Sequence, residues 1–270
     1  MDYPSYSAPA LPPGVAAEAV ERLRAISKEE GVRIFAAVES GSRAWGFPSP
    51  DSDYDVRFIY LRPVADYLRL DPVRDVIERP LDGLWDINGW DLRKALLLLA
   101  RGNAVVVEWL RSPLVYLEEG DLAQRMRDLA DRHGDVPASV RHYYGLLHGG
   151  WAREFGDSSR VRLKKYFYVI RAAAALAWLR RYGTTPPMAL PDLIAGDVLP
   201  AAVGDEVAGL LAAKQIASEM GEGERRPVLD RFIVDHLDWA VETGAPRDAR
   251  PPAELLTAVD ALFREAVLRP

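Results

Sequence analysis

The segments that favour β-strands are confined to the first 117 of the 270 residues. The strand-like runs are Val32–Glu39, Tyr54–Leu61 and a predicted hairpin over Asp75–Trp90. The helical spacing of apolar residues predicts one helix before them, over Val15–Glu30. A second helix is predicted over Leu92–Arg101, with Asp91 as its N-cap. This part of the chain therefore predicts a mixed α and β domain.

After about residue 118 the strand signals stop and helical periodicity takes over. The predicted helices are Asp121–His133, Pro137–Phe155, Arg160–Tyr182, Asp205–Met220, Arg226–Glu242 and Ala253–Leu268. We therefore predict an α+β fold with three parts. These are a loose N-terminal segment over residues 1–14, a small mixed-sheet domain over 15–117 and a helical domain over 118–270.

Composition excludes several classes of protein. Hydrophobic residues make up 49%, which is too many for a disordered chain. The net charge of -6 excludes a globally basic nucleic-acid binder, although a local basic groove stays open. The absence of cysteine excludes disulfides, thiolate metal sites and a cysteine nucleophile. No run approaches the roughly 20 apolar residues of a membrane span, and Met1–Gly14 lacks the features of a signal peptide, so we predict a cytoplasmic protein without a membrane partner.

The most informative stretch is Glu39–Leu61, ESGSRAWGFPSPDSDYDVRFIYL. Here Asp53 and Asp55 alternate with apolar residues, which places them on one face of a strand together with Arg57. Such a pair is by itself more often a solvated strand end. Two close carboxylates repel each other, however, and a divalent cation such as Mg²⁺ compensates them while also binding substrate phosphates. The turn at Gly41 and Ser42 offers backbone N–H groups and a hydroxyl to a phosphate.

Other catalytic motifs are missing from the sequence. It has no Walker A loop, no G-x-S-x-G elbow and no G-x-G-x-x-G loop, so a P-loop NTPase, a serine hydrolase and a Rossmann dehydrogenase have no support. The four histidines show no metal-ligand spacing.

Gly41-Ser42, ten intervening residues and then Asp53-x-Asp55 resemble the signature of the DNA polymerase β-like nucleotidyltransferase superfamily. The longer string GSRAWGFPSPDSDYDVRF, followed by DINGWDLRKAL and GNAVVVEWL, is similar to its RlaP-type branch, predicted nucleotidyltransferases linked to RNA repair. The resemblance covers Ser40–Trp109 and extends more loosely to the lysine-containing helix near residue 165.

This resemblance implies a polymerase β-like palm and transfer of a nucleoside monophosphate from an NTP, ATP among them, to a hydroxyl acceptor by a two-metal mechanism with Mg²⁺ or Mn²⁺. Asp53 and Asp55 would be metal ligands and catalytic residues. A third carboxylate is expected on a neighbouring strand, where we favour Asp86 over Asp91, because helix capping already explains Asp91. Gly41 and Ser42 would hold triphosphate oxygens.

The remaining candidates are cations. Arg57 either neutralises the acidic cluster or meets a substrate phosphate. On the predicted helix over Arg160–Tyr182, Lys164 and Arg171 share a face, while Lys165 is rotated by roughly 100° from Lys164. A solvated face explains such a charge run equally well. The resemblance implies that Lys164, Lys165 or Arg171 binds the nucleotide.

The acceptor stays open at this level. The resemblance suggests an RNA end and RNA-repair enzymes as partners, yet a negatively charged chain has no general attraction to polynucleotides. Protein and small-molecule acceptors, or a catalytically silent nucleotide- or RNA-binding partner of a repair complex, are the alternatives.

Overall fold

The computed structural model describes residues 8, 11–156, 158–216, 221–243 and 251–268. The chain forms two compact units, neither of which is continuous in sequence. The sheet unit comprises Asp53–His133 with the described parts of 7–44 and 250–270. The helical unit comprises Trp45–Ser52 with the described part of 134–249.

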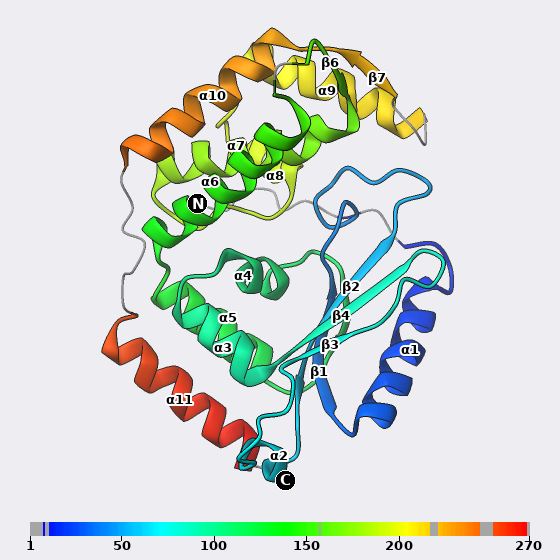
Figure 1. The fold of residues 1–270 in the computed structure, drawn as a ribbon, viewed down its shortest axis with the longest axis vertical. Coiled ribbons are helices and arrows are strands. Elements are labelled where there is room, and N and C mark those ends of the chain that lie inside the picture. The colour runs from blue at the N-terminus through cyan, green and yellow to red at the C-terminus, as the bar shows by residue number, and fades with distance from the viewer. Residues whose placement is uncertain (1–7, 9–10, 157, 217–220, 244–250, 269–270) are drawn as a thin grey trace. The chain divides into compact units, whose positions relative to one another are not determined.

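A five-stranded mixed sheet forms the centre of the sheet unit (Figure 1). Its strands are β1 (Arg33–Glu39), β2 (Tyr54–Leu61), β3 (Val76–Glu78), β4 (Trp85–Asp91) and β5 (Val115–Glu118). They lie in the order β3-β4-β2-β1-β5, with β2 and β4 parallel and the other neighbours antiparallel. The parallel pair sets Tyr54 opposite Trp85 and Asp55 opposite Asp86.

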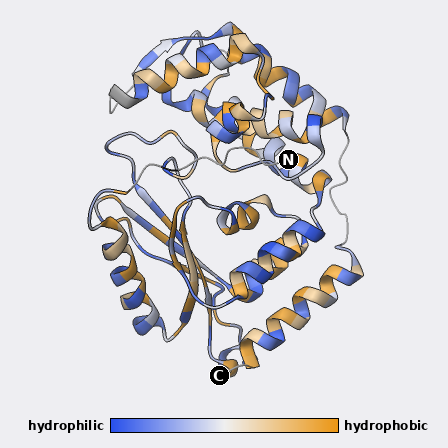
Figure 2. Cartoon of the chain, turned by 180° about the vertical axis from the view of Figure 1, so that it is seen from behind, coloured by the Kyte–Doolittle hydropathy of each residue, from blue (hydrophilic) through white to orange (hydrophobic). Residues whose placement is uncertain are grey.

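Helices cover both faces of this sheet (Figure 1). The helices of the sheet unit are α1 (Val15–Glu30), α3 (Leu92–Ala100), α4 (Ala104–Leu110), α5 (Leu122–Arg132) and α11 (Ala253–Leu268), with the short α2 (Val64–Tyr67) beyond the end of β2. On one face, α1 packs through Ala19, Leu23 and Ile26 against Val56 and Phe58 of β2. Both α1 and α5 carry hydrophilic as well as hydrophobic residues (Figure 2), and their buried residues recur at helical spacing, as in amphipathic helices.

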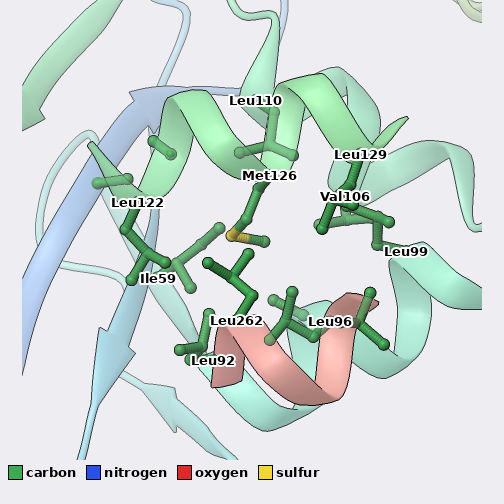
Figure 3. Close-up of a cluster of buried hydrophobic side chains, with 14 of the residues drawn as sticks. Ile59, Leu92, Leu96, Leu99, Val106, Leu110, Leu122, Met126, Leu129 and Leu262 are labelled. Carbon is green, nitrogen blue, oxygen red and sulfur yellow. The ribbon is translucent and has the colours of Figure 1, made fainter. Parts of the chain in front are cut away.

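The other face packs against α3, α4, α5 and α11. Figure 3 shows Ile59 of β2 beside Met126 of α5 and Leu262 of α11. Because side chains alternate along a strand, Asp55 and Arg57 of β2 lie on the same face as Ile59. The acidic residues thus project on the side of the sheet opposite α1.

The helical unit contains one long buried helix. Its elements are α6 (Val136–Glu154), β6 (Arg160–Arg162), α7 (Lys164–Tyr182), α8 (Leu190–Ala195), α9 (Ala201–Ile216), β7 (Glu222–Glu224) and α10 (Pro227–Glu242). Most of α7 is buried, which agrees with its run of alanines and large apolar residues. Within the described residues, no helix is long and apolar enough to span a membrane.

Several sequence-based expectations match the structure. The α+β class is confirmed, and α1 and β2 have the predicted bounds. The hairpin over Asp75–Trp90 is present as the antiparallel pair β3 and β4.

Other expectations were wrong. We expected no strands after residue 118, and this prediction was wrong. Arg160–Arg162, predicted as the start of a helix, pairs with Glu222–Glu224 in a two-stranded antiparallel ribbon. A strand of three residues is too short to show an alternating pattern of apolar residues, and its pairing with a distant segment cannot be recognised from the local sequence. The helix predicted over Asp205–Met220 begins earlier, at Ala201. The last four residues of that prediction, 217–220, lie outside the described part of the chain. Nine residues of the predicted N-terminal segment also lie outside it. The short elements α2, α4, β5 and α8 were not predicted.

The two compact units also differ from the predicted division at residue 117. The helices α5 and α11 belong to the sheet unit, and Trp45–Ser52 belongs to the helical unit. The difference arises because α11 returns to the core around Ile59, a contact that sequence periodicity does not encode.

Asp91 serves as the N-cap of α3, as the sequence indicates. Its carboxylate accepts hydrogen bonds from the Arg93 N–H at 2.8 Å and from the Tyr67 hydroxyl at 2.9 Å. We expect Asp91→Ala to lower the free energy of unfolding by about 0.5–2 kcal/mol, because a helix cap is lost. Urea unfolding would measure this change, and Asp66→Ala, which removes an acidic residue from the first turn of α2, where Pro63 is the N-cap, provides the control. Unfolding curves that superimpose on those of the parent would contradict the capping role.

Candidate active site

The acidic candidates meet at one end of β2. Asp55 and Asp86 lie opposite each other on the parallel strands β2 and β4, so their carboxylates are neighbours. The Asp55 and Asp86 side chains are 26% and 35% exposed, which leaves both within reach of a ligand. Asp53 is exposed and directly precedes β2, and its carbonyl oxygen accepts a hydrogen bond from Arg43 Nε at 3.2 Å.

Arg57 joins the two central carboxylates. Its Nη2 donates to Asp55 Oδ1 at 3.2 Å and to Asp86 Oδ2 at 2.8 Å, and its Nη1 donates to the Asp86 carbonyl oxygen at 2.8 Å. The Asn88 amide donates to the other Asp86 oxygen at 2.8 Å. Of the two roles considered for Arg57, the structure shows the pairing with the acidic cluster.

The charges around Asp55 oppose one another. Burial raises the pKa of Asp55 above its usual value, Arg57 lowers it, and the nearby carboxylates of Asp86 and Asp53 raise it. The carboxylate of Asp55 therefore lies close enough to those of Asp86 and Asp53 for their negative charges to raise its pKa.

Gly41 lies directly against Asp55. A Cβ atom built on Gly41 would stand 1.6 Å from Asp55 Oδ2 and 2.4 Å from Asp55 Cγ, so only glycine permits this approach. Ser42 follows in the same turn and is 9% exposed. The structure therefore brings Gly41, Ser42, Asp55, Asp86 and Arg57 together in the sheet unit.

The donor set of this site suits a hard divalent cation. It consists of carboxylate oxygens on adjacent strands at one register position, with Asp53 two residues away along the chain. In the part of the chain that the structure describes, no three His, Cys, Asp or Glu side chains are arranged so that they could hold a metal ion together. Asp55 and Asp86 form ion pairs with Arg57.

Sequence reasoning did not select Glu39, the last residue of β1. Its side chain is 0% exposed, and its carboxylate accepts hydrogen bonds from the Tyr116 hydroxyl at 2.6 Å and the Asp55 N–H at 3.0 Å. Burial raises the pKa of Glu39 to about 7, although these hydrogen bonds and one from the Gly41 N–H oppose the rise. The sequence did contain a signal that could have identified Glu39, because this acidic residue ends an apolar strand just before Gly41 and Ser42.

The predicted cations other than Arg57, which are Lys164, Lys165 and Arg171, lie in the helical unit and occupy two different environments. Lys164 and Lys165 line a cavity of about 370 Å³ together with Arg162 and Tyr168. Lys165 Nζ lies 3.3 Å from Glu154 Oε1, and Arg162 Nη2 lies 2.7 Å from Glu154 Oε2. Gly221 and Glu222 also line this cavity, which we call the cationic pocket hereafter.

Arg171 lies elsewhere in the helical unit and is 4% exposed. Its Nη1 donates to the Met188 carbonyl oxygen at 3.3 Å, and its guanidinium lies 4.4 Å from the centre of the Trp45 ring. These contacts hold the segment Trp45–Ser52 within the helical unit. Tyr168 is 40% exposed and lines the cationic pocket.

Lys214 anchors the same segment and is 1% exposed. Its ammonium group donates to the Phe47 carbonyl oxygen and lies 4.8 Å and 5.0 Å from the centres of the Phe47 and Phe167 rings. Burial lowers the pKa of Lys214 to about 8, and the charge of Lys164 lowers it as well, against the opposing effect of Asp51. No motif in the sequence pointed to this residue.

The depressed pKa of Lys214 predicts how stability depends on pH. Between about pH 8 and the ordinary lysine value of 10.5, the unfolded chain binds more protons at this site than the folded protein. The contribution of Lys214 to the free energy of unfolding should therefore increase as the pH rises through this range. Urea unfolding of the parent and of Lys214→Met would show a difference that grows with pH. Lys28→Met, at an exposed position of α1, is the control for removal of a lysine. Parallel pH profiles for the parent and Lys214→Met would refute the prediction.

Comparison with known proteins identifies the family of this chain. The model of a DNA polymerase β family of the RNA repair pathway, RlaP, matches residues 15–265. The chain belongs to the RlaP family. A relative, the uncharacterized protein YcgL of Bacillus subtilis (strain 168), is 40% identical over 223 residues, which cover 83% of this chain and 85% of YcgL.

The chain is also similar to one solved structure, that of a nucleotidyltransferase-like protein from Exiguobacterium sibiricum 255-15. The match covers 91% of this chain and 78% of the chain of that protein. It has 12% sequence identity and a TM-score of 0.30, and the family assignment does not rest on it. Membership of the RlaP family confirms the resemblance seen in the sequence. A polymerase β-type family indicates nucleotidyl transfer as the general chemistry.

Proposed function

We propose that this chain transfers a nucleoside monophosphate from an NTP to a hydroxyl acceptor. The observation that carries the proposal is the pairing of Asp55 with Asp86 across parallel strands, with the Gly41 turn in contact with Asp55. In the reaction the acceptor oxygen forms a bond to the α-phosphorus, the bond from that phosphorus to the β-phosphate bridging oxygen breaks, and pyrophosphate leaves.

Asp53, Asp55 and Asp86 would hold Mg²⁺ or Mn²⁺, because their carboxylate oxygens are the donors that these ions take. A divalent cation at this place would neutralise charge on the transferring phosphoryl group. We assign to Asp86 the further role of accepting the proton from the attacking hydroxyl. Asn88, which donates to Asp86 Oδ1, would keep this carboxylate oriented.

Arg57 and the Gly41–Ser42 turn complete the acidic site. Arg57 balances the charge of Asp55 and Asp86 through hydrogen bonds to both, and contact with a substrate phosphate would be a second use of the same guanidinium. Gly41 and Ser42 form the turn beside Asp55, and we propose that phosphate oxygens of the NTP bind at this turn. Positioning and charge neutralisation of this kind carry most of the catalysis in phosphoryl transfer.

The cationic pocket is a second place where phosphates would bind. Arg162, Lys164 and Lys165 line it together with Glu222, and its volume of about 370 Å³ admits a polyphosphate group. Glu154 pairs with Arg162 and Lys165, whereas no ion pair is seen for Lys164 among the described residues. Arg171 was a candidate for the same role, but its contacts with Met188 and Trp45 support a structural one. We therefore assign nucleotide phosphates to Lys164 and Lys165.

Replacing Lys164 or Lys165 by alanine should weaken NTP binding more than nucleoside binding. A charge-assisted hydrogen bond contributes roughly 1.5–3 kcal/mol, so we expect affinity for NTP to fall by about ten- to a hundredfold. Isothermal titration with NTP and with the matching nucleoside would measure both. Lys94→Ala, which removes a lysine paired with Asp75 in the sheet unit, is the control. Equal losses for the two ligands would argue against phosphate contact.

We propose an RNA end as the acceptor and RNA-repair enzymes as partners, on the strength of the family description. A cytoplasmic location, where NTP and Mg²⁺ are available, is part of the same proposal. Incubation with α-labelled NTPs, Mg²⁺ or Mn²⁺ and, in turn, RNA oligonucleotides, protein and small-molecule hydroxyl compounds would test it. Label on RNA would support the proposal. Label only on protein or on a small molecule would show that the acceptor is that compound and not RNA. Binding of NTP without transfer to any acceptor would indicate a silent partner of a repair complex.

A further inference from the structure

The buried carboxylate of Glu39 takes hydrogen bonds from two points of the acidic site. The Asp55 N–H donates to Glu39 Oε1 at 3.0 Å, and the Gly41 N–H donates to the same carboxylate. The other oxygen, Oε2, accepts from the Tyr116 hydroxyl at 2.6 Å. Glu39 thus connects the glycine turn, the start of β2 and the edge strand β5.

These contacts continue the ladder between β1 and β2 beyond its last pair. That pair is Glu39 with Val56, followed by the hydrogen bond from the Ser40 N–H to the Asp55 carbonyl oxygen at 2.9 Å. The Tyr54 N–H donates to the Leu84 carbonyl oxygen before β4 at 2.7 Å. Because N–H groups alternate in direction along a strand, the Asp55 N–H points back towards β1, where the Glu39 side chain replaces a backbone acceptor.

The backbone of Glu39 is fixed as firmly as its side chain. Its N–H donates to the Leu114 carbonyl oxygen at 2.9 Å, and its carbonyl oxygen accepts from the Ser112 hydroxyl at 2.6 Å. The carboxylate is therefore held at a set position between Gly41 and Asp55. The same two residues make the close approach that excludes a Cβ atom on Gly41.

We infer that Glu39 is a positioning residue that fixes the Gly41 turn against Asp55 and thereby sets the affinity of the acidic site for a divalent cation. The inference rests on the proposed function, because it assigns Asp55 to a metal. Groups that orient metal ligands from behind change metal affinity by about ten- to a hundredfold when they are removed. A buried glutamate that served only the fold would change stability and leave that affinity unaltered.

Mn²⁺ binding to the full chain, measured by electron paramagnetic resonance, tests the inference without an acceptor or an activity assay. Glu39→Met fills the site without offering a carboxylate, and we expect the dissociation constant for Mn²⁺ to rise by about tenfold or more. Glu39→Gln keeps an oxygen for the backbone N–H groups and an amide that can donate to the Tyr116 oxygen, so it should restore most of the affinity. Glu108→Gln, which alters another buried glutamate of the sheet unit, should bind Mn²⁺ as the parent does.

A second measurement follows the geometry itself. Amide hydrogen exchange at Gly41 and Asp55 should become faster in Glu39→Met and stay slow in Glu39→Gln. If Glu39→Met fails to fold, Tyr116→Phe removes one hydrogen bond from the carboxylate and should weaken Mn²⁺ binding by a smaller factor.

The outcomes separate this inference from the proposed function. Parent-like Mn²⁺ affinity in folded Glu39→Met, or in Tyr116→Phe when Glu39→Met does not fold, would overturn the role of Glu39 and leave the metal site standing. Absence of Mn²⁺ binding by the parent chain would instead overturn the metal assignment, and the inference with it. Equal weakening in Glu39→Met and Glu39→Gln, with exchange at Gly41 and Asp55 unchanged, would also overturn positioning, because loss of negative charge would then explain the result.

Discussion

Replacement of Asp55 by asparagine should abolish nucleotidyl transfer and leave the protein folded. The substitution keeps the size of the side chain but removes the charge that a divalent cation requires. A bound cation supplies several kcal/mol of transition-state stabilisation, and each 1.36 kcal/mol corresponds to a factor of ten in rate, so we expect a loss on the order of a thousandfold. Turnover of labelled NTP with Mg²⁺ measures the effect.

The fold should tolerate this change because Arg57 retains its hydrogen bonds to Asp86 when Asp55 is neutral. Circular dichroism and urea unfolding would verify that the variant is folded. Asp71→Asn, at an exposed position after α2, is the matched control for removal of one carboxylate. Full activity of folded Asp55→Asn would eliminate Asp55 as a metal ligand.

Gly41→Ala should have an effect of similar size for a steric reason. The added methyl group would stand 1.6 Å from Asp55 Oδ2 and 2.8 Å from Asp55 Cβ, distances at which either the turn or the carboxylate must move. Overpacking of this kind costs roughly 1–3 kcal/mol of stability. Movement of the Asp55 carboxylate away from Arg57 and Asp86 should in addition remove most of the transfer activity, as in Asp55→Asn.

The helix glycine Gly209 offers a control with the same chemical change. A Cβ atom at Gly209, in α9, would meet no atom within 4 Å, and alanine is favoured over glycine inside a helix by about 1 kcal/mol. Gly209→Ala should therefore be as active as the parent and slightly more stable. Wild-type activity in Gly41→Ala would show that the close contact with Asp55 is not needed for the chemistry.

The sequence predicts those elements whose signals are local. β2 and α1 have the expected bounds because apolar periodicity, a C-terminal glycine at Gly31 and flanking turn residues all act within one element. Asp91 was identified as a cap for the same reason, since the cap and the helix that it caps are adjacent in sequence.

Features that depend on register or on distant pairing could not be predicted in this way. That Asp86 lies opposite Asp55 follows from parallel pairing of β2 and β4, which the sequence alone does not specify. The ribbon of β6 and β7 joins segments about 60 residues apart, and Glu39 acquires its role only when β5 brings Tyr116 beside it. The spacing of Asp53 and Asp55 made this pair recognisable in the sequence. The contacts of Asp55 with Asp86 and Glu39, in contrast, depend on the fold.

The assignment of α11 to the sheet unit has a consequence for how the chain folds. Leu255, Val259 and Leu262 pack in the same cluster as Phe35 and Ile59, so this core joins residues separated by about 200 positions. Closing such a large loop is entropically costly and slow, and contacts of high sequence separation lower folding rates. During synthesis, the apolar surface of α3 and α5 that α11 covers stays exposed until the whole helical unit and then α11 have been made. This surface is where an incompletely synthesised chain is most open to chaperones and to aggregation.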